Sequence, residues 1–145
     1  MKNEFTSYFQ RLGLSTTLQT RIQEIFDFYA TLCREDIIHV FVTEHITEDG
    51  TRNFESLWLL SSNFVMEAKG FVSRDDFDMA ELSTPICYWE MQKQDYDFKV
   101  ATDKSRMSFR FRFPSDVGGQ LKASRENCDA LRDLIVKYFV PKMRR

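Results

Sequence analysis

Strict alternation of apolar and polar residues marks residues 105–113. One parity carries Met107, Phe109, Phe111 and Phe113. The other parity carries Ser108 and three arginines, which are Arg106, Arg110 and Arg112. This period of two predicts a β-strand with one buried face and one solvated face. We expect the aromatic face to lie at the centre of the core, so that Phe109→Asp abolishes folding.

Two amphipathic helices are predicted ahead of this strand. Apolar residues at positions i, i+3, i+4 and i+7 over residues 5–12 predict a short helix that stops at Gly13. A second apolar stripe predicts a longer helix from about Ser15 to Cys33. Hydroxyl residues at its start are suited to capping.

Period-two segments separated by turn residues predict seven antiparallel strands. Their approximate ranges are 36–43, 54–60, 64–69, 82–91, 96–100, 105–113 and 118–123. The acidic segment 74–81 is interpreted as a connection or a poorly ordered edge. Ser124 is predicted to cap a final helix that stops at Pro141, and residues 141–145 form a basic tail.

The order of these elements indicates one α+β domain over residues 1–145. Over residues 36–140 the order resembles the pleckstrin-homology superfold, in which two bent sheets form a half-open barrel and the last helix plugs one end. The resemblance implies a seven-stranded antiparallel half-barrel with a C-terminal capping helix. Residues 1–34 add a helical pair that packs on the sheet.

The outward face of the first three predicted strands is unusually apolar. Its side chains are Ile37, Phe41, Leu57, Leu59 and Val65. An apolar patch of this size is rarely left in water. We expect the second helix to cover it; left open, the same face would be a dimer interface.

Charge and cysteine usage restrict the class of protein. The chain has 20 Lys and Arg against 22 Asp and Glu, so its formal net charge is −2. This balance gives no general attraction to nucleic acid or to an anionic membrane. The three cysteines are far apart in sequence, and we expect buried thiols in a reducing compartment. Without a signal-peptide pattern or a membrane-spanning run, we expect a soluble cytoplasmic protein.

The arginine face is the main candidate for a site. Arg106, Arg110 and Arg112, together with Lys99 on the neighbouring predicted strand, could bind an anion or a protein partner. The alternative is a charged ladder, in which Asp97 pairs across strands with an arginine. Lipid binding in the resembled superfold uses basic residues around the first hairpin. That hairpin is mainly acidic here, with Arg52 its one fixed positive charge, which argues against phosphoinositide binding.

Other chemistry is weakly indicated. His39 and His45 lie about 20 Å apart along an extended strand, too far to share one metal ion. The acidic segment 74–81 lacks the alternating ligands and central glycine of a calcium loop. The sequence contains no nucleophile elbow or phosphate-binding glycine loop. No catalytic residue, metal or cofactor is therefore predicted.

These patterns favour a non-catalytic module that binds an unidentified protein or peptide. The contact surface would be the sheet edge at the fourth and fifth predicted strands, or the arginine face. One alternative is a cone-shaped α+β domain that binds a small molecule or acts as an enzyme, using Tyr88, His39 or Asp97. Another is a peripheral membrane module that binds anionic lipid through the arginine face and the basic tail. A homodimer also remains open.

Overall fold

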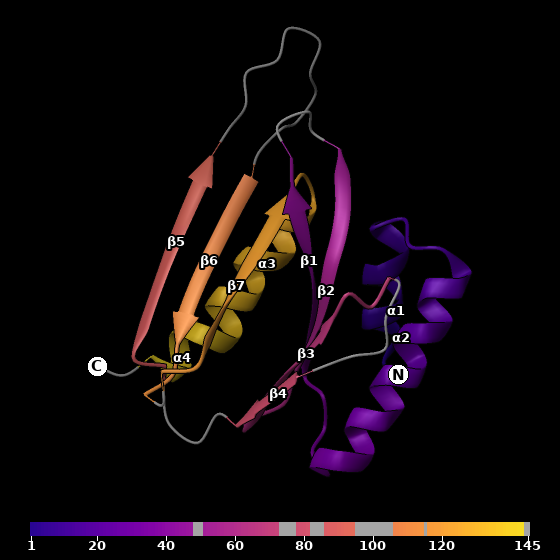
Figure 1. The fold of residues 1–145 in the computed structure, drawn as a ribbon, viewed down its shortest axis with the longest axis horizontal. Helices are drawn as coiled ribbons and strands as arrows, with labels where there is room; N and C mark the ends of the chain where they lie inside the picture. Colours follow the sequence, from indigo (N-terminus) through magenta and orange to yellow (C-terminus); the bar gives the residue numbers. More distant parts are fainter. Residues whose placement is uncertain (48–50, 73–77, 82–85, 95–105, 115, 144–145) are drawn as a thin grey trace, which may run out of the picture. The chain divides into compact units, whose positions relative to one another are not determined.

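The computed structural model describes residues 1–47, 51–72, 78–81, 86–94, 106–114 and 116–143. These residues form two compact units, of which unit 1 comprises Met1–Val42 and Glu55–Glu81, and unit 2 comprises Thr43–Phe54 and Leu82–Arg145. The helical elements are α1 (Asn3–Arg11), α2 (Thr16–Cys33), α3 (Asn127–Leu134), the π-helix η1 (Ile135–Phe139) and α4 (Val140–Lys142) (Figure 1). The strands are β1 (His39–Ile46), β2 (Arg52–Leu60), β3 (Phe64–Lys69), β4 (Asp78–Glu81), β5 (Tyr88–Gln94), β6 (Arg106–Arg112) and β7 (Gly118–Ser124).

The strands belong to two separate sheets, so the predicted seven-stranded half-barrel is wrong. One sheet has four strands in the order β1-β2-β3-β4, and the other has three in the order β5-β6-β7. Among the strands with a described register, β2, β3 and β4 pair antiparallel, as do β5, β6 and β7. The α+β class is correct, but the hairpin pattern alone could not show where one sheet ends and the next begins.

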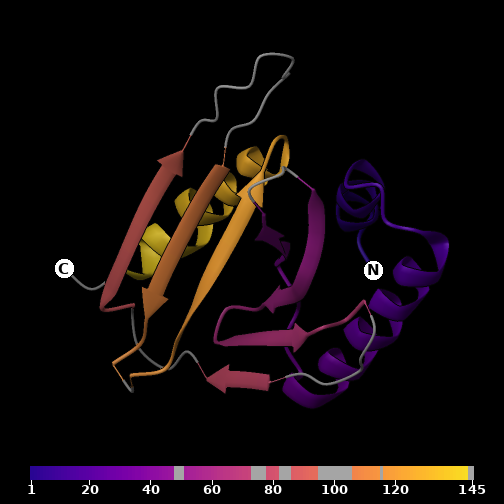
Figure 2. The same cartoon turned by 45° about the horizontal axis from the view of Figure 1, so that its top comes forward.

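Helix α2 follows its predicted stripe and cap. Ser15 precedes it with extended backbone, and its hydroxyl accepts a hydrogen bond from the Leu18 N–H at 3.2 Å. In unit 1 the helix contacts β3, and Figure 2 shows β3 and β4 antiparallel beside it. The Tyr29 hydroxyl lies 3.3 Å from the Ser61 hydroxyl, and Arg21 donates to the Phe71 carbonyl at 3.0 Å. The predicted apolar face is buried, at 4% exposure or less, for Ile37, Phe41, Leu57, Leu59 and Val65.

Helix α1 completes unit 1 through its aromatic face. Tyr8 stacks near Phe41, with ring centroids 6.5 Å apart, and its hydroxyl accepts the Val42 N–H at 3.0 Å. Phe5 packs near Phe26 at 6.1 Å. An aromatic side chain that also satisfies a strand N–H fixes the helix in both position and rotation.

The interpretation of the acidic segment 74–81 as a connection or a poorly ordered edge needs correction in part. Residues 78–81 form strand β4, which pairs with β3 and is the terminal strand of its sheet. The expected strand at residues 96–100 falls outside the described residues. Acidic side chains lower strand propensity only weakly, and pairing with an existing edge can override that preference.

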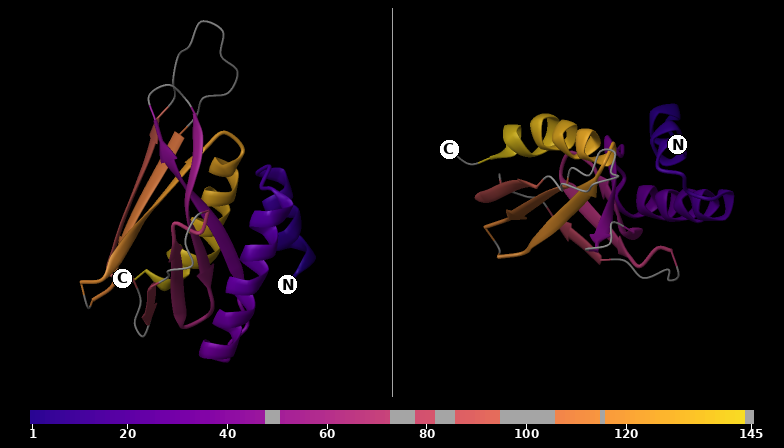
Figure 3. Two further views of the ribbon diagram at one scale, coloured as in Figure 1. Left: turned by 45° about the vertical axis from the view of Figure 1, so that its right-hand side comes forward. Right: turned by 90° about the horizontal axis from the view of Figure 1, so that it is seen from above.

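Unit 2 is built on the Met and Phe side of β6, as its alternation predicts. Met107, Phe109, Phe111 and Phe113 are all buried, at 4% exposure or less. The rings of Phe109 and Phe111 lie 4.7 Å and 4.8 Å from that of Phe139 in η1. Within unit 2, Figure 3 shows the C-terminal helix along one face of the β5-β6-β7 sheet. The helix therefore covers the face of an open sheet, and the expected barrel plug is wrong.

Both ends of the predicted C-terminal helix also differ. Ser124 is the last residue of β7, and helix α3 begins at Asn127. Pro141 lies within α4, where the prediction had the helix stop. The π-helix immediately before it widens the turn, and Val140 donates its N–H to the Ile135 carbonyl. This local change relieves the clash that proline makes with the preceding turn of an α-helix. No helix in the described ranges is long and apolar enough to cross a membrane.

Candidate functional site

The face of the β5-β6-β7 sheet that carries the β6 arginines is a grid of polar side chains. The β6 arginines alternate with buried aromatics, so they all project onto this face. Arg110 lies between Glu90 on β5 and Gln120 on β7, and Arg112 lies between Tyr88 and Gly118. One end of the face therefore carries two guanidinium groups and the Tyr88 ring. Space is left beside them because Gly118 has no side chain.

A surface groove of about 730 Å³ occupies this end of the face. Its walls come from the start of β5, the end of β6 and the start of β7. They comprise Cys87, Tyr88, Arg110, Phe111, Arg112, Asp116, Gly118, Gly119 and Gln120. A Cβ at Gly118 would lie 2.2 Å from the Phe111 carbonyl oxygen, so this position requires glycine. The groove is thus a built feature of the sheet, with two arginines at its rim.

Each groove arginine has an exposed carboxylate partner. Arg110 donates to Glu90 at 2.6 Å, and Arg112 lies 3.3 Å from Asp116. Glu90 also accepts hydrogen bonds from the Tyr88 hydroxyl at 2.8 Å and from Gln92. The hydrogen bond from Arg110 lowers the pKa of Glu90, and the same bond raises the pKa of Arg110. The hydrogen bond to Glu90 raises the pKa of Tyr88. At neutral pH the groove thus presents two guanidinium groups and a neutral phenol.

The predicted arginine site is brought together only in part. Arg110 and Arg112 share the groove, whereas Arg106 lies at the opposite end of β6, opposite Gln94 and Ser124. Lys99 and Asp97 fall outside the described residues. Within the described part of unit 2, the carboxylate on the neighbouring strand is Glu90 of β5, which lies opposite Arg110. The predicted cross-strand ladder thus has a described counterpart in the Glu90–Arg110 pair.

Cys87 is exposed, which corrects the expectation of a buried thiol. Its backbone N–H and its thiol both lie near the Arg112 carbonyl oxygen, at 3.1 Å and 3.4 Å. Cys128 is buried, as predicted, while the side chain of Cys33 lies outside the description. The exposed thiol lies at the rim of the groove, where a thiol-reactive probe could be attached.

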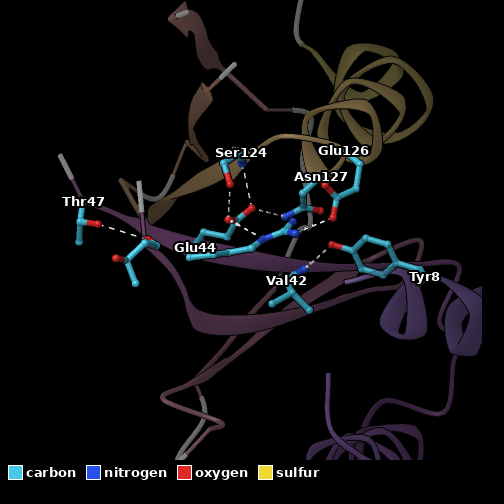
Figure 4. Close-up of polar contacts among 9 residues, drawn as sticks. Tyr8, Val42, Glu44, Thr47, Ser124, Glu126 and Asn127 are labelled. Atoms are coloured by element: carbon cyan, nitrogen blue, oxygen red, sulfur yellow. Dashed lines mark hydrogen bonds and ion pairs between the residues drawn. The ribbon is translucent and has the colours of Figure 1, made fainter. Parts of the chain in front are cut away.

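A second polar cluster in unit 2 is buried and centres on Glu44 of β1. This side chain is 0% exposed. Its carboxylate accepts hydrogen bonds from the Ser124 N–H at 2.8 Å and the Ser124 hydroxyl at 2.6 Å. It also accepts from the Asn127 amide at 2.9 Å, and Figure 4 shows both side chains directed at it. Asn127 is the first residue of α3, so the carboxylate ties β1 to the corner between β7 and α3.

Arg52 of β2 completes this cluster. Its Nε donates to Glu44 at 3.0 Å, and one terminal nitrogen donates to Glu126 at 2.5 Å. The other terminal nitrogen, Nη2, is buried and has no hydrogen-bond partner among the described residues. Burial opposes the charge of Arg52, but hydrogen bonds to Glu126 and Glu44 outweigh it and raise the pKa. Burial likewise raises the pKa of Glu126, yet the bond from Arg52 prevails and leaves that pKa below its ordinary value.

The Glu44 cluster is suited to fixing structure. A general base needs a free lone pair within reach of a substrate proton. Glu44 has four donors on two oxygens and is fully buried. Arg52, the one fixed positive charge of the acidic first hairpin, is directed at Glu44 and Glu126, and its side chain is only 15% exposed. Both charges therefore hold the β1–β2 hairpin to the β7–α3 corner.

Sequence reasoning missed Glu44, although a signal was present. Glu44 has the same strand parity as Val42, which is fully buried. A carboxylate on an apolar parity requires partners, because an isolated buried charge is very unfavourable. The partners themselves, about 80 residues away, could not be found from local pattern.

The two histidines considered as metal ligands do not form a site among the described residues. His39 belongs to unit 1 and His45 to unit 2. Among the described residues, no group of three or more His, Cys, Asp and Glu side chains could hold a metal ion. No family model, curated protein or solved structure matches the chain. Nothing therefore identifies a pleckstrin-homology protein.

Proposed function

We propose that this protein is a non-catalytic interaction module that binds an acidic segment of a partner protein in the groove at Arg110 and Arg112. The groove itself supports the proposal best. Its two guanidinium groups are 57% and 60% exposed and lie beside the side-chain-free backbone of Gly118. A guanidinium fork matches a carboxylate in two parallel hydrogen bonds, which gives direction as well as charge.

The existing ion pairs of these arginines are suited to exchange. Exposed pairs contribute only roughly 0.2–1 kcal/mol each, because water and salt screen both partners. The Arg112–Asp116 pair is exposed on both sides, at 60% and 83%. An incoming carboxylate therefore replaces one weak partner by another and adds contacts in the groove.

Local charge favours a protein segment over a polyanion. Asp116 lines the groove, and Glu90 lies next to Arg110. These carboxylates repel a ligand with several clustered charges, such as a phosphorylated headgroup or a nucleic acid backbone. A segment with separate carboxylates can place each against one arginine. Tyr88 offers an apolar ring beside them, a common feature of protein-binding surfaces.

The enzyme or small-molecule alternative has less support. It needs polar groups that converge on an enclosed cavity. Of its expected groups, Tyr88 lies on the exposed face, His39 belongs to the other unit, and Asp97 is outside the described residues. The buried carboxylate, Glu44, is saturated with donors.

The test is fluorescence anisotropy with a labelled peptide of alternating Glu and Val. A Gln–Val peptide of equal length serves as the uncharged probe. The variant is Arg110→Glu/Arg112→Glu, and the control is Arg132→Glu/Lys137→Glu, which changes net charge equally at exposed positions of the C-terminal helix. We expect the groove variant to lose at least about tenfold in affinity for the Glu–Val peptide, or ~1.4 kcal/mol. The control should bind like the wild type.

Equal binding by the wild type, the groove variant and the control would refute the proposal. So would equal affinity for the Gln–Val peptide. Sedimentation with anionic vesicles forms a further arm. Vesicle binding that the groove variant abolishes, without peptide binding, would assign the same arginines to lipid and overturn the protein-partner proposal.

A further inference from the structure

Strand β5 forms a free edge of the three-stranded sheet as far as the structure describes it. It is the terminal strand in the order β5-β6-β7. Two large side chains on it are exposed, Tyr88 at 44% and Met91 at 45%. Just before the strand, Ile86 forms a parallel bridge with Met143 of the C-terminal segment. The chain thus covers its own edge at Ile86 and leaves the edge from Tyr88 onward open to pairing.

The hydrogen-bond phase of the sheet shows which backbone groups face this edge. Phe113 donates its N–H to the Val117 carbonyl at 2.7 Å, in the same register as the β6–β7 pairs. Bonded pairs alternate along antiparallel strands, so the odd residues of β6 bond to β7 and the even ones to β5. The even-numbered residues of β5 lie opposite the even-numbered residues of β6, so they form the hydrogen-bonded pairs between these two strands. The N–H and C=O groups of Trp89, Met91 and Lys93 therefore point away from β6.

We propose that a second copy of this chain occupies the edge, with the two β5 strands antiparallel about a two-fold axis at Met91. The three-stranded sheets of the two copies then form one continuous sheet. The outward backbone groups of Met91 pair with those of Met91 in the second copy. Those of Trp89 pair with Lys93 of the second copy, and the reverse. Each such pair exchanges two backbone hydrogen bonds.

The side chains of β5 are complementary to themselves in this register. The two exposed Met91 side chains meet on the axis and remove each other from water. Trp89 lies opposite Lys93 of the second copy, on the same face, so an ammonium group can lie over an indole ring. Glu90 lies opposite Gln92, an amide that can donate to the carboxylate. No like charges are opposed.

Neighbouring registers are less favourable. An axis at Glu90 places two carboxylates face to face, and an axis at Lys93 does the same for two ammonium groups. Like charges directly opposite each other destabilise a strand pair. An axis at Gln92 sets Met91 against Lys93 and leaves the start of the strand unpaired. The charges on this edge, which commonly prevent strand pairing, instead select one register and one partner.

A second copy fits this edge better than an unrelated peptide. Any extended segment could use the backbone groups. Only a strand with the same sequence pattern has all three matching residues. It places an apolar side chain opposite Met91, a cation opposite Trp89 and an amide opposite Glu90. The proposal is independent of the groove, because neither Arg110 nor Arg112 takes part in the pairing.

Sedimentation equilibrium over a range of protein concentrations tests the proposal. We expect the wild type to approach twice the monomer mass of 17.2 kDa at high concentration, with dissociation in the micromolar range typical of small interfaces. Met91→Lys and Met91→Glu each place like charges on the axis and should be monomeric. Their equimolar mixture should restore the dimer, because Lys then faces Glu. The control Val136→Lys changes another exposed apolar residue, at 60% exposure, and should leave the dimer intact.

Thermal melts of each variant confirm that the fold is retained. Met91 is exposed on an edge, so either substitution should change the melting temperature by only a few degrees. A wild type that stays monomeric up to millimolar concentration would overturn the proposal. A dimer that persists in both single variants, or a mixture of the two that stays monomeric, would also overturn it.

Discussion

Glu44→Gln removes one negative charge from the centre of unit 2 while keeping the shape of the side chain. The carboxylate accepts four hydrogen bonds, from Arg52, from Asn127 and twice from Ser124. An amide has one oxygen and one NH2 group. Whichever way it is turned, the NH2 group meets two donors, and Arg52 loses the negative charge at its buried end.

The expected loss of stability follows from this environment. Breaking a buried ion pair by removing one partner costs about 3–5 kcal/mol. Arg52 keeps its bond to Glu126, whose side chain is 49% exposed, so we expect a loss near the lower limit, about 3 kcal/mol. That is a large part of the roughly 5–15 kcal/mol that stabilises a typical domain.

Urea unfolding followed by circular dichroism at the helix band measures this loss. With a slope of about 2 kcal/mol per molar urea, the midpoint should fall by about 1.5 M. Hydrogen exchange should show the largest loss of protection in α3, because Glu44 binds its first residue, Asn127. The control, Glu126→Gln, breaks the exposed end of the same chain of charges and should cost less than about 1 kcal/mol.

A double-mutant cycle separates the pair from its surroundings. Arg52→Gln alone leaves Glu44 buried beside three neutral donor groups and should also be costly. The double variant should cost less than the sum of the two single variants, because neither charge is then left unpaired. An unfolding free energy for Glu44→Gln within about 0.5 kcal/mol of the wild type would refute the assignment of Glu44 as a buried charge that fixes the fold.

Two further predictions concern the core and the response to acid. The ring centroids of Phe109 and Phe139 lie 4.7 Å apart, so Phe109→Asp places a carboxylate in an aromatic core. This variant should show no cooperative unfolding by circular dichroism. The control Arg132→Asp, on the exposed face of the C-terminal helix, should still unfold cooperatively. A soluble, cooperatively melting Phe109→Asp protein would contradict the placement of that ring. Folding lowers the pKa values of Glu90 and Glu126. Their contribution to the stability of the folded state is therefore present above the unfolded-state pKa of about 4.3, and it is lost as the pH falls through the lower folded-state pKa values. Melting temperatures between pH 6 and pH 3 should therefore decline less in Glu90→Gln/Glu126→Gln than in the wild type, and parallel curves would argue against this linkage.

The sequence pattern correctly predicted the elements in which apolar residues repeat with a single period, either that of a strand or that of a helix. The alternation over residues 105–113 identified β6 and its buried side, including Phe109 and Phe111. The stripe and the Ser15 cap identified α2 within one residue at its start. In each case one face is fully apolar, so a shift of register would move every large side chain into water.

What failed depended on contacts between distant residues. The division into two sheets depends on how strands beyond the hairpins pair, and local alternation carries no information about this. Residues 78–81 were interpreted as a connection or a poorly ordered edge because their acidic side chains are typical of loops, while the pairing of β4 with β3 is a tertiary effect. Ser124 was taken for a helix cap because it precedes the helix. Its hydroxyl and N–H are instead used by Glu44, which is distant in sequence.

The two polar clusters of unit 2 can be distinguished by how far their groups are satisfied and exposed. Glu44 is fully buried and accepts four hydrogen bonds, so a ligand could reach it only by breaking the β7–α3 corner. Arg110 and Arg112 are exposed and held by single carboxylates, so a ligand could replace those partners without moving the backbone. Desolvation makes the first cluster costly to disturb, and screening makes the second inexpensive to rearrange. On this reasoning, substitutions at Glu44 should change stability and leave peptide affinity unchanged wherever the protein is folded, and substitutions at the two arginines should do the reverse.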